Sequence, residues 1–208
     1  KLTIAPLPLG PISDGDQTVC ESDPIQTLTA TATVAAGDSI VWYDALGNVT
    51  NNPTLSTIGT VSYYAEAVGP LPTQCVNPTR TEVILTIKDT PEAPSSGGDI
   101  EQCVQSPIQT LTATATAPTG ATVVWYDSET GGASVLSPTL NTVGTITYYA
   151  ESDLAGCLSP TRTAVKLTIA PLPLAPISDG NQTVCESDPI QTLTATATVA
   201  AGDSIVWY

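Results

Sequence analysis

The chain has 208 residues, of which 41% are apolar, and it carries a formal net charge of −15. This composition can form a packed core and is not typical of a disordered chain. The acidic balance argues against binding to nucleic acid or to an anionic membrane surface, because both need clustered Lys and Arg. The chain has no histidine, which removes the usual catalytic triads, most zinc sites and the commonest general base. No apolar run is as long as a membrane span, and we expect neither an enzyme nor membrane insertion.

Internal repetition is the strongest feature of the sequence. The ten residues PIQTLTATAT occur at 24–33, 107–116 and 189–198. Residues 1–43 match residues 166–208 at 41 of 43 positions. The repeating unit is therefore about 82 residues long, and units of two types alternate.

These periods predict four segments. They are the last strand and linker of a preceding unit at 1–9, complete units at 10–91 and 92–173, and the truncated start of a third unit at 174–208. The stretches between units are short and rich in proline, and such linkers are stiff. We expect a segment of a longer tandem array.

Each unit is predicted to be built from β-strands. In the first unit, the alternation in IQTLTATAT (25–33) is typical of a half-buried strand, with Leu28, Ala30 and Ala32 facing the core. Further strands are expected at SIVWYD (39–44), TVSYYAEAV (60–68) and TRTEVILTI (79–87). No segment has helical periodicity, and several short strands per unit predict an all-β sandwich.

The order of these strands resembles the plan of an immunoglobulin domain, in which a core disulfide packs against a tryptophan. Here Ala30 lies twelve residues before Trp42, and Ala65 lies two residues after Tyr63. Alanines therefore occupy the positions of that core disulfide. We expect Trp42, and Trp125 in the second unit, to pack over these small residues. The predicted fold is a tandem of immunoglobulin-like β-sandwiches joined by short proline-rich linkers.

The five cysteines lie outside those core positions. Cys20 and Cys75 are displaced outward from the two alanines by ten residues each, so we predict the disulfides Cys20–Cys75 and Cys103–Cys157. Each would close a loop of about 55 residues and stabilise its unit by about 4 kcal/mol. We expect the partner of Cys185 beyond the end of the chain. Metal or redox chemistry is the alternative, which the lack of CxxC and of histidine disfavours, whereas disulfides indicate an oxidising compartment.

The segments TVCESDPIQTLTATA, IVWYDALGN, PTLSTIGTVSYYAEAV and CVNPTRTEVILTI resemble the CHU_C-associated Ig-like repeats of very large surface proteins from gliding and related Gram-negative bacteria. The resemblance covers the whole chain. It implies export by type IX secretion, display on the bacterial cell surface, and a role in a stalk or adhesin such as the giant adhesins of gliding motility. The partners that it implies are neighbouring repeats of the chain and the secretion or motility machinery.

Few side chains are candidates for a functional site. Arg80 and Arg162 are expected to form an ion pair or a stacking contact that holds the last strand, with ligand binding as the alternative. Tyr43 and Tyr126 are expected to pack against a neighbouring strand or loop, with stacking on a sugar as the alternative. The threonine rows suit outward-facing strand positions better than an ice-binding surface.

Acidic residues and two serines raise possible modifications. The acidic residues near the starts of the units are Asp14, Asp16, Glu21, Asp23, Asp99, Glu101, Asp179, Glu186 and Asp188. Carboxylates at a domain junction could bind Ca²⁺, but no complete calcium-loop signature is present, so we expect solvated charge and no cofactor. The tripeptide DSI resembles the O-glycosylation acceptor pattern of this bacterial group, which marks Ser39 and Ser204.

The leading functional hypothesis is structural. The units are expected to be stalk or spacer repeats of a large extracellular adhesin, for surface attachment or gliding motility. The alternative is a module that binds carbohydrate or a substratum weakly and gains avidity through repetition.

Overall fold

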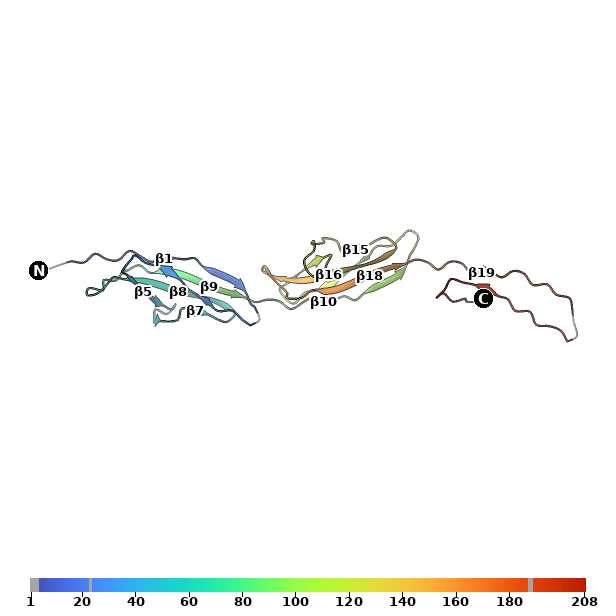
Figure 1. Ribbon diagram of the computed structural model, residues 1–208, viewed down its shortest axis with the longest axis horizontal. Coiled ribbons are helices and arrows are strands. Elements are labelled where there is room, and N and C mark those ends of the chain that lie inside the picture. Colours follow the sequence, from blue (N-terminus) through green and yellow to red (C-terminus); the bar gives the residue numbers. More distant parts are fainter. Residues whose placement is uncertain (1–3, 23, 187–188) are drawn as a thin grey trace.

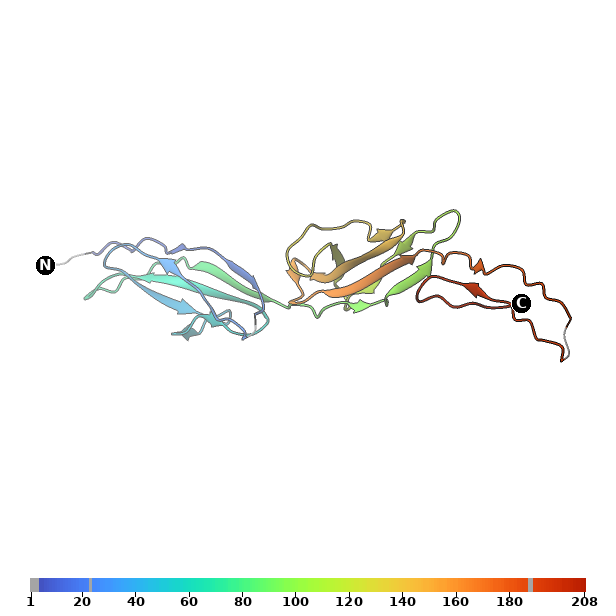
Figure 2. The same ribbon diagram turned by 45° about the vertical axis from the view of Figure 1, so that its right-hand side comes forward.

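The computed structural model describes residues 4–22, 24–186 and 189–208. Within these ranges the chain forms 20 strands and no helix, so the predicted all-β class is confirmed. None of the described segments is a helix able to cross a membrane. Figures 1 and 2 show two complete units and a third, partial unit following one another along the long axis of the molecule.

The first unit has one large sheet and two small ladders. Its strands are β1 (Ile12–Ser13), β2 (Gln17–Cys20), β3 (Leu28–Thr29), β4 (Ala32–Thr33), β5 (Ser39–Tyr43), β6 (Val49–Thr50), β7 (Thr54–Leu55), β8 (Gly59–Val68) and β9 (Thr81–Lys88). The large sheet has the order β2-β9-β8-β5-β6, and the ladders are β1–β4 and β3–β7. Strands β2 and β9 are parallel, whereas the other pairs are antiparallel.

The second unit repeats this plan. Its strands are β10 (Ser95–Ser96), β11 (Ile100–Cys103), β12 (Leu111–Thr112), β13 (Ala115–Thr116), β14 (Thr122–Tyr126), β15 (Thr139–Leu140), β16 (Gly144–Leu154), β17 (Cys157–Leu158) and β18 (Thr163–Ala170). The large sheet has the order β11-β18-β16-β14, with β17 paired to β16, and the ladders are β10–β13 and β12–β15. In the partial third unit, β19 (Ile177–Ser178) pairs with β20 (Ala197–Thr198).

In both complete units, the repeated motif PIQTLTATAT forms two short strands where one was expected. Leu28 and Ala30 are buried, Ala32 is half-buried, and the threonines that alternate with them are exposed, which agrees with the predicted alternation. However, β3 pairs with β7, and β4 pairs with β1. Pro53 comes directly before β7 and lies opposite Ala30, where it accepts a hydrogen bond from the Ala30 amide but cannot donate one to the ladder. The chain therefore changes partners at Thr31.

The core of each unit lies between the large sheet and the ladders. The buried cluster of the first unit consists of Leu28, Ala30, Val83, Leu85 and Ile87. Trp42 packs against this cluster, and its direct strand partner is Ala65, which is completely buried. The cluster of the second unit contains Leu111, Ala113, Leu140, Tyr148, Val165, Leu167 and Ile169, with Trp125 packed against it. Each tryptophan therefore packs against a buried cluster that contains an alanine, Ala30 in the first unit and Ala113 in the second.

A tyrosine on the central strand of each unit fastens the sheet to the opposite layer. The Tyr63 hydroxyl donates to the Thr54 carbonyl at 2.8 Å, and Tyr148 makes the same bond to Thr139 at 2.8 Å. This bond has the character of the tyrosine corner of immunoglobulin sandwiches. It lets a half-buried hydroxyl keep a hydrogen bond, which avoids the cost of an unpaired polar group.

Candidate functional site: the joint between the two units

The two cysteines predicted to pair within the first unit lie at opposite ends of its sheet. Cys20 ends β2 and lies opposite Lys88, the last residue of β9. Cys75 lies between the end of β8 at Val68 and the start of β9 at Thr81. Because β9 has eight residues, these ends are about 25 Å apart, whereas a disulfide needs Cα atoms within about 7 Å. The prediction of a Cys20–Cys75 bond is therefore wrong.

The disulfide joins the two units. Cys20 is bonded to Cys157, which lies 137 residues further along the chain, and their Cα atoms are 5.6 Å apart. The predicted Cys103–Cys157 bond is therefore also wrong. Cys75, Cys103 and Cys185 are free thiols. The bond closes no loop within either unit. It therefore stabilises the joint between the units and not the fold of one unit.

A tight hairpin of the second unit carries Cys157 to the joint. Ala155 and Gly156 form the turn before β17, with φ values of 52° and 89°. Positive φ at both positions is typical of a type I′ turn, whose twist matches a β-hairpin. The Gly156 amide donates to the Asp153 carboxylate at 2.8 Å, which fixes the turn. Across the joint, the Lys88 ammonium group donates to the Ala155 carbonyl at 3.0 Å.

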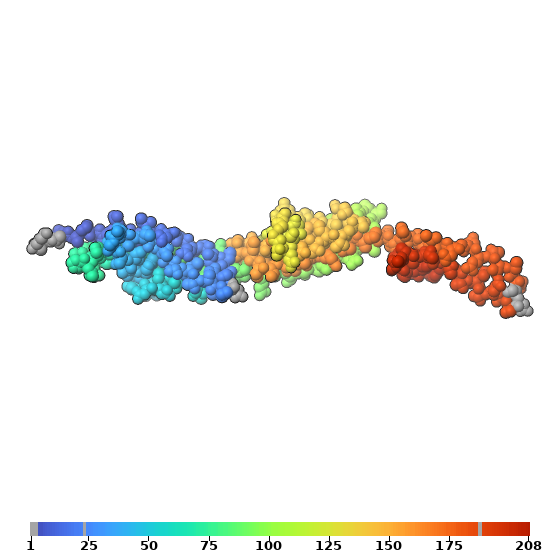
Figure 3. Space-filling model, viewed as in Figure 1, coloured from blue at the N-terminus to red at the C-terminus, as the bar shows by residue number. Residues whose placement is uncertain are grey.

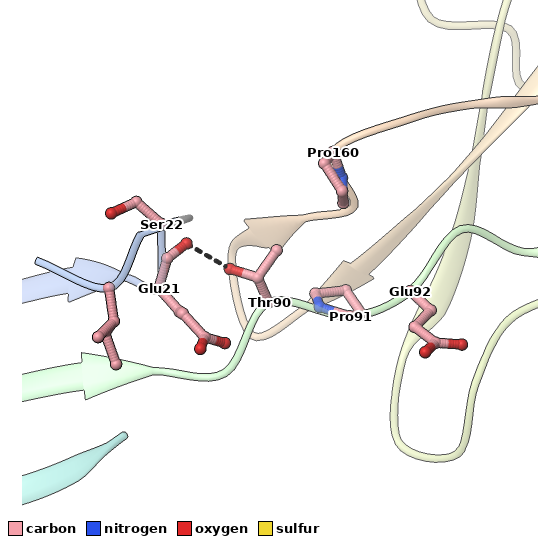
Figure 4. Close-up of a pocket in the computed structure, with 7 residues that line it drawn as sticks. Glu21, Ser22, Thr90, Pro91, Glu92 and Pro160 are labelled. Atoms are coloured by element: carbon pink, nitrogen blue, oxygen red, sulfur yellow. Dashed lines mark hydrogen bonds between the residues drawn. The ribbon is translucent and has the colours of Figure 1, made fainter. Parts of the chain in front are cut away.

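The linker of residues 89–94 passes beside this bridge and is fastened at both ends. The Thr90 hydroxyl donates to the Glu21 carbonyl at 2.9 Å (Figure 4), and the Thr163 hydroxyl of the second unit donates to the Pro94 carbonyl at 2.6 Å. A cavity of about 570 Å³ opens between linker and units. Its lining residues are Glu21, Ser22, Ile25, Thr90, Pro91, Glu92 and Pro160. The space-filling view shows the two units in contact at the joint (Figure 3).

Each unit also carries a stacked group of Arg, Tyr and Glu side chains on its large sheet. The Arg80 guanidinium lies 3.3 Å from the centre of the Tyr43 ring and donates to Glu66 at 2.8 Å. The Tyr43 hydroxyl donates to the same carboxylate at 2.8 Å. Burial acts to raise the pKa of Glu66, but the hydrogen bonds from Arg80 and Tyr43 and the charge of Arg80 outweigh it and lower the pKa. The hydrogen bond to Glu66 raises the pKa of Tyr43.

The second unit repeats the group with a different set of bonds. Arg162 stacks at 3.4 Å on the ring of Tyr126 and pairs with Glu151 at 3.4 Å. It also donates to the Ser128 and Gly131 carbonyls, at 2.8 and 2.7 Å. The expected stacking and ion pairs of both arginines are therefore confirmed. One face of each tyrosine ring is covered, which leaves less of it for a sugar.

Two of the acidic residues near the unit starts, Asp16 and Asp99, have structural roles. The Asp16 carboxylate accepts the Ile84 amide at 2.8 Å, and Asp99 accepts the Lys166 amide at 2.8 Å, so each fastens the loop before β2 or β11 to the last strand. Asp23 and Asp188 lie outside the described residues, as do residues 1–3 of the predicted first segment. Among the residues that are described, no group of three or more Cys, Asp or Glu side chains is placed to hold a metal ion.

The sandwiches and the bridged joint define the class of the protein as a tandem of immunoglobulin-like domains. Residues 8–88 and 91–171 each match the family model of the Ig-like domain, CHU_C associated. The chain therefore belongs to this family. No protein of curated function matches it in sequence.

Several solved structures of low sequence identity are similar to this chain. Fibronectin(III)-like modules of Clostridium thermocellum CbhA are 16% identical, with 77% of this chain and 94% of that one covered and a TM-score of 0.41. The I-band fragment I67–I69 from titin is 12% identical, with 83% and 70% covered and a TM-score of 0.44. A structure of Sidekick-1 immunoglobulin domains 1–5 is 15% identical, with 83% and 41% covered and a TM-score of 0.43.

Proposed function

We propose that these units are stalk or spacer repeats of a large cell-surface adhesin, which serve surface attachment or gliding motility. The observation that carries the proposal is the Cys20–Cys157 bond across the joint. Neighbouring units are attached at two points, the linker of residues 89–94 and the disulfide. Two separated attachments restrict bending and twisting far more than a single short linker does, and a spacer that must hold a binding region away from a cell needs this stiffness.

The remaining features agree with a spacer outside the cytosol. Disulfides persist in oxidising compartments, and immunoglobulin-like domains are typically non-catalytic. The net charge of −15 keeps neighbouring stalks apart by repulsion. Export by type IX secretion and contact with secretion or motility machinery are parts of this proposal that come from the family resemblance. O-glycosylation is a further part, and both Ser39 and Ser204 are exposed.

We expect the disulfide to set the stiffness of the joint. Small-angle X-ray scattering of the oxidised chain should give a narrow distribution of overall lengths, because the two units keep one orientation. A Cys157→Ser variant should give a broader distribution with shorter, bent forms, since only the linker remains. Cys103→Ser is the matched control, because it removes an exposed thiol outside the bridge. Identical profiles for the oxidised chain and for Cys157→Ser would contradict the spacer proposal.

The adhesin role has its own test. An antibody against residues 8–171 should label intact, unpermeabilised cells of the source bacterium, and external protease should remove the label. Labelling that needs permeabilised cells would overturn the surface location. Weak binding to carbohydrate or to a substratum is the second candidate for the array, and a glycan array probed with the whole chain tests it directly.

A further inference from the structure

Three cysteines of the chain carry free thiols, and each of them has a bonded counterpart in another unit. Cys103 is the second unit's equivalent of Cys20, and Cys75 is the first unit's equivalent of Cys157. Cys185 is the equivalent of Cys20 in the partial third unit. The chain therefore contains one complete joint and, at Cys75 and Cys103, both of the chemical components of another.

The backbone around Cys103 reproduces the surroundings of Cys20. Cys103 ends β11, which is parallel to β18, and lies opposite Ala170, just as Cys20 lies opposite Lys88. The amide after each cysteine donates to the carbonyl of that opposite residue at 2.8 Å. The loop that follows is also the same, because the side chain of Gln109 donates to the Cys103 carbonyl as that of Gln26 does to the Cys20 carbonyl. Cys103 is thus presented at the far end of the second unit, with its side chain exposed.

The surroundings of Cys75 match those of Cys157 in the same way. Cys75 follows β8 in a hairpin, with Val76 bridged to Val68 and the Asn77 amide donating to the Ala67 carbonyl at 3.0 Å. At Cys157 the corresponding bond runs from the Ser159 amide to the Ser152 carbonyl at 2.9 Å. The loop before Cys75 is three residues longer than the turn before Cys157.

The stretch before the first unit also passes beside Cys75. A cavity of about 300 Å³ is lined by residues 5–9 on one side and by Cys75 with its hairpin on the other. At the complete joint the linker of residues 89–94 and Pro160, three residues after Cys157, line the larger cavity in the corresponding place. Cys75 therefore lies at the end of the first unit where a bridge to a neighbour forms in the second.

We propose that Cys103 and Cys75 are the two halves of a repeated inter-unit disulfide, and that the partner surface for each is another copy of this repeat. Cys103 bonds to the Cys75-type cysteine of the unit that follows, and Cys185 bonds to a Cys157-type cysteine in the same way. Each bond forms when two thiols pass two protons and two electrons to a disulfide-containing oxidant, which is reduced to two thiols. The inference concerns how units join, and it stands apart from what the array does at a surface.

The loops closed by successive bonds of this kind would overlap along the sequence. The loop closed by Cys20 and Cys157 already contains Cys103, so a bond from Cys103 to the next unit closes a second loop that overlaps the first. Each unit is then held covalently to the unit before it and to the unit after it. A single broken disulfide leaves the neighbouring joints bridged.

The test extends the chain in its own register. Residues 1–208 are followed by a second copy of residues 44–208, which continues the repeat because residues 166–208 match residues 1–43 at 41 of 43 positions. The protein is oxidised with glutathione disulfide, its free thiols are alkylated, and linked peptides are identified by mass spectrometry without reduction. We expect Cys103 linked to the second copy of Cys75, beside the Cys20–Cys157 bond and its repetition between Cys185 and the second copy of Cys157.

Formation of the bond between Cys185 and the second copy of Cys157 serves as the internal control that the added units have folded and docked. If that bond forms while Cys103 and the second copy of Cys75 are alkylated, the proposal is overturned. Absence of the control bond also contradicts the proposal, because the Cys20–Cys157 bond would then not be repeated at the later joint. A Cys103→Ser variant should free only the second copy of Cys75. The readout is connectivity alone, so a failure here leaves the surface proposal to its own test.

Discussion

Pulled by its two ends, the oxidised chain should extend by about 470 Å less than the reduced chain, at about 3.4 Å per residue for the 137 residues between the bonded cysteines. The reason is the path of the force, which runs from the N-terminal side to Cys20, across the disulfide to Cys157, and on to the C-terminal end. Residues 21–156 lie inside the closed loop and bear no tension. Single-molecule force spectroscopy measures this difference as contour length.

The oxidised and reduced chains should also differ in the unfolding steps that they show under force. The reduced chain should show two steps of about 280 Å each, since each matched domain has about 81 residues. The oxidised chain should lack both steps, and Cys20→Ser should restore them without reductant. Cys103→Ser is the control that should change nothing. If the oxidised chain instead lost only about 55 residues of length per unit, the bonds would lie within the units, and the bridge described here would be contradicted.

Truncating a fully buried leucine should strongly destabilise its unit. Leu85 on β9 is fully buried in the core of the first unit, so Leu85→Ala should lower the free energy of unfolding of that unit by about 2–5 kcal/mol. Hydrogen exchange measured by mass spectrometry separates the two units by their peptides. The matched control is Thr86→Ala on the opposite face of the same strand, where the cost should be about 0.5 kcal/mol, the loss of its bond to Thr60.

The destabilisation should stay within the first unit. The bridge lies at the end of the sheet and closes no loop within either unit, so protection of β18 in the second unit should not change in Leu85→Ala. Equal loss of protection in both units would show that they unfold as one cooperative body. That result would contradict the expectation that the bridged units unfold independently.

The sequence predicts the strands and core of each unit because these depend on local pattern. The alternation in β9 puts Val83, Leu85 and Ile87 inside, and Trp42 packs against the cluster that these residues form. The short ladders are harder to predict, because the break between β3 and β4 depends on which strand Pro53 precedes and on where that strand pairs. That information is in the tertiary arrangement.

The joint is where sequence reasoning failed, and strand direction explains the failure. Equal displacement of Cys20 and Cys75 from the core alanines gives a symmetrical pattern along the chain, but it says nothing about the ends of the sheet on which the two residues lie. Because β2 is parallel to β9, Cys20 lies at the end of the unit where β9 ends and the chain leaves for the second unit. The hairpin with Cys75 lies at the opposite end, where β9 begins. The missing information is the topology of the sheet, because the parallel pairing of β2 with β9 places Cys20 at the end of the first unit that meets the second unit.

The identity of the disulfide is the central claim, and a peptide map made without reduction tests it most directly. The oxidised chain is alkylated, digested and analysed by mass spectrometry. The structure predicts one linked pair, Cys20 with Cys157, and alkylated thiols at Cys75, Cys103 and Cys185. A map that links Cys20 to Cys75 and Cys103 to Cys157 would contradict it, because the two units would then be separate domains on a single tether.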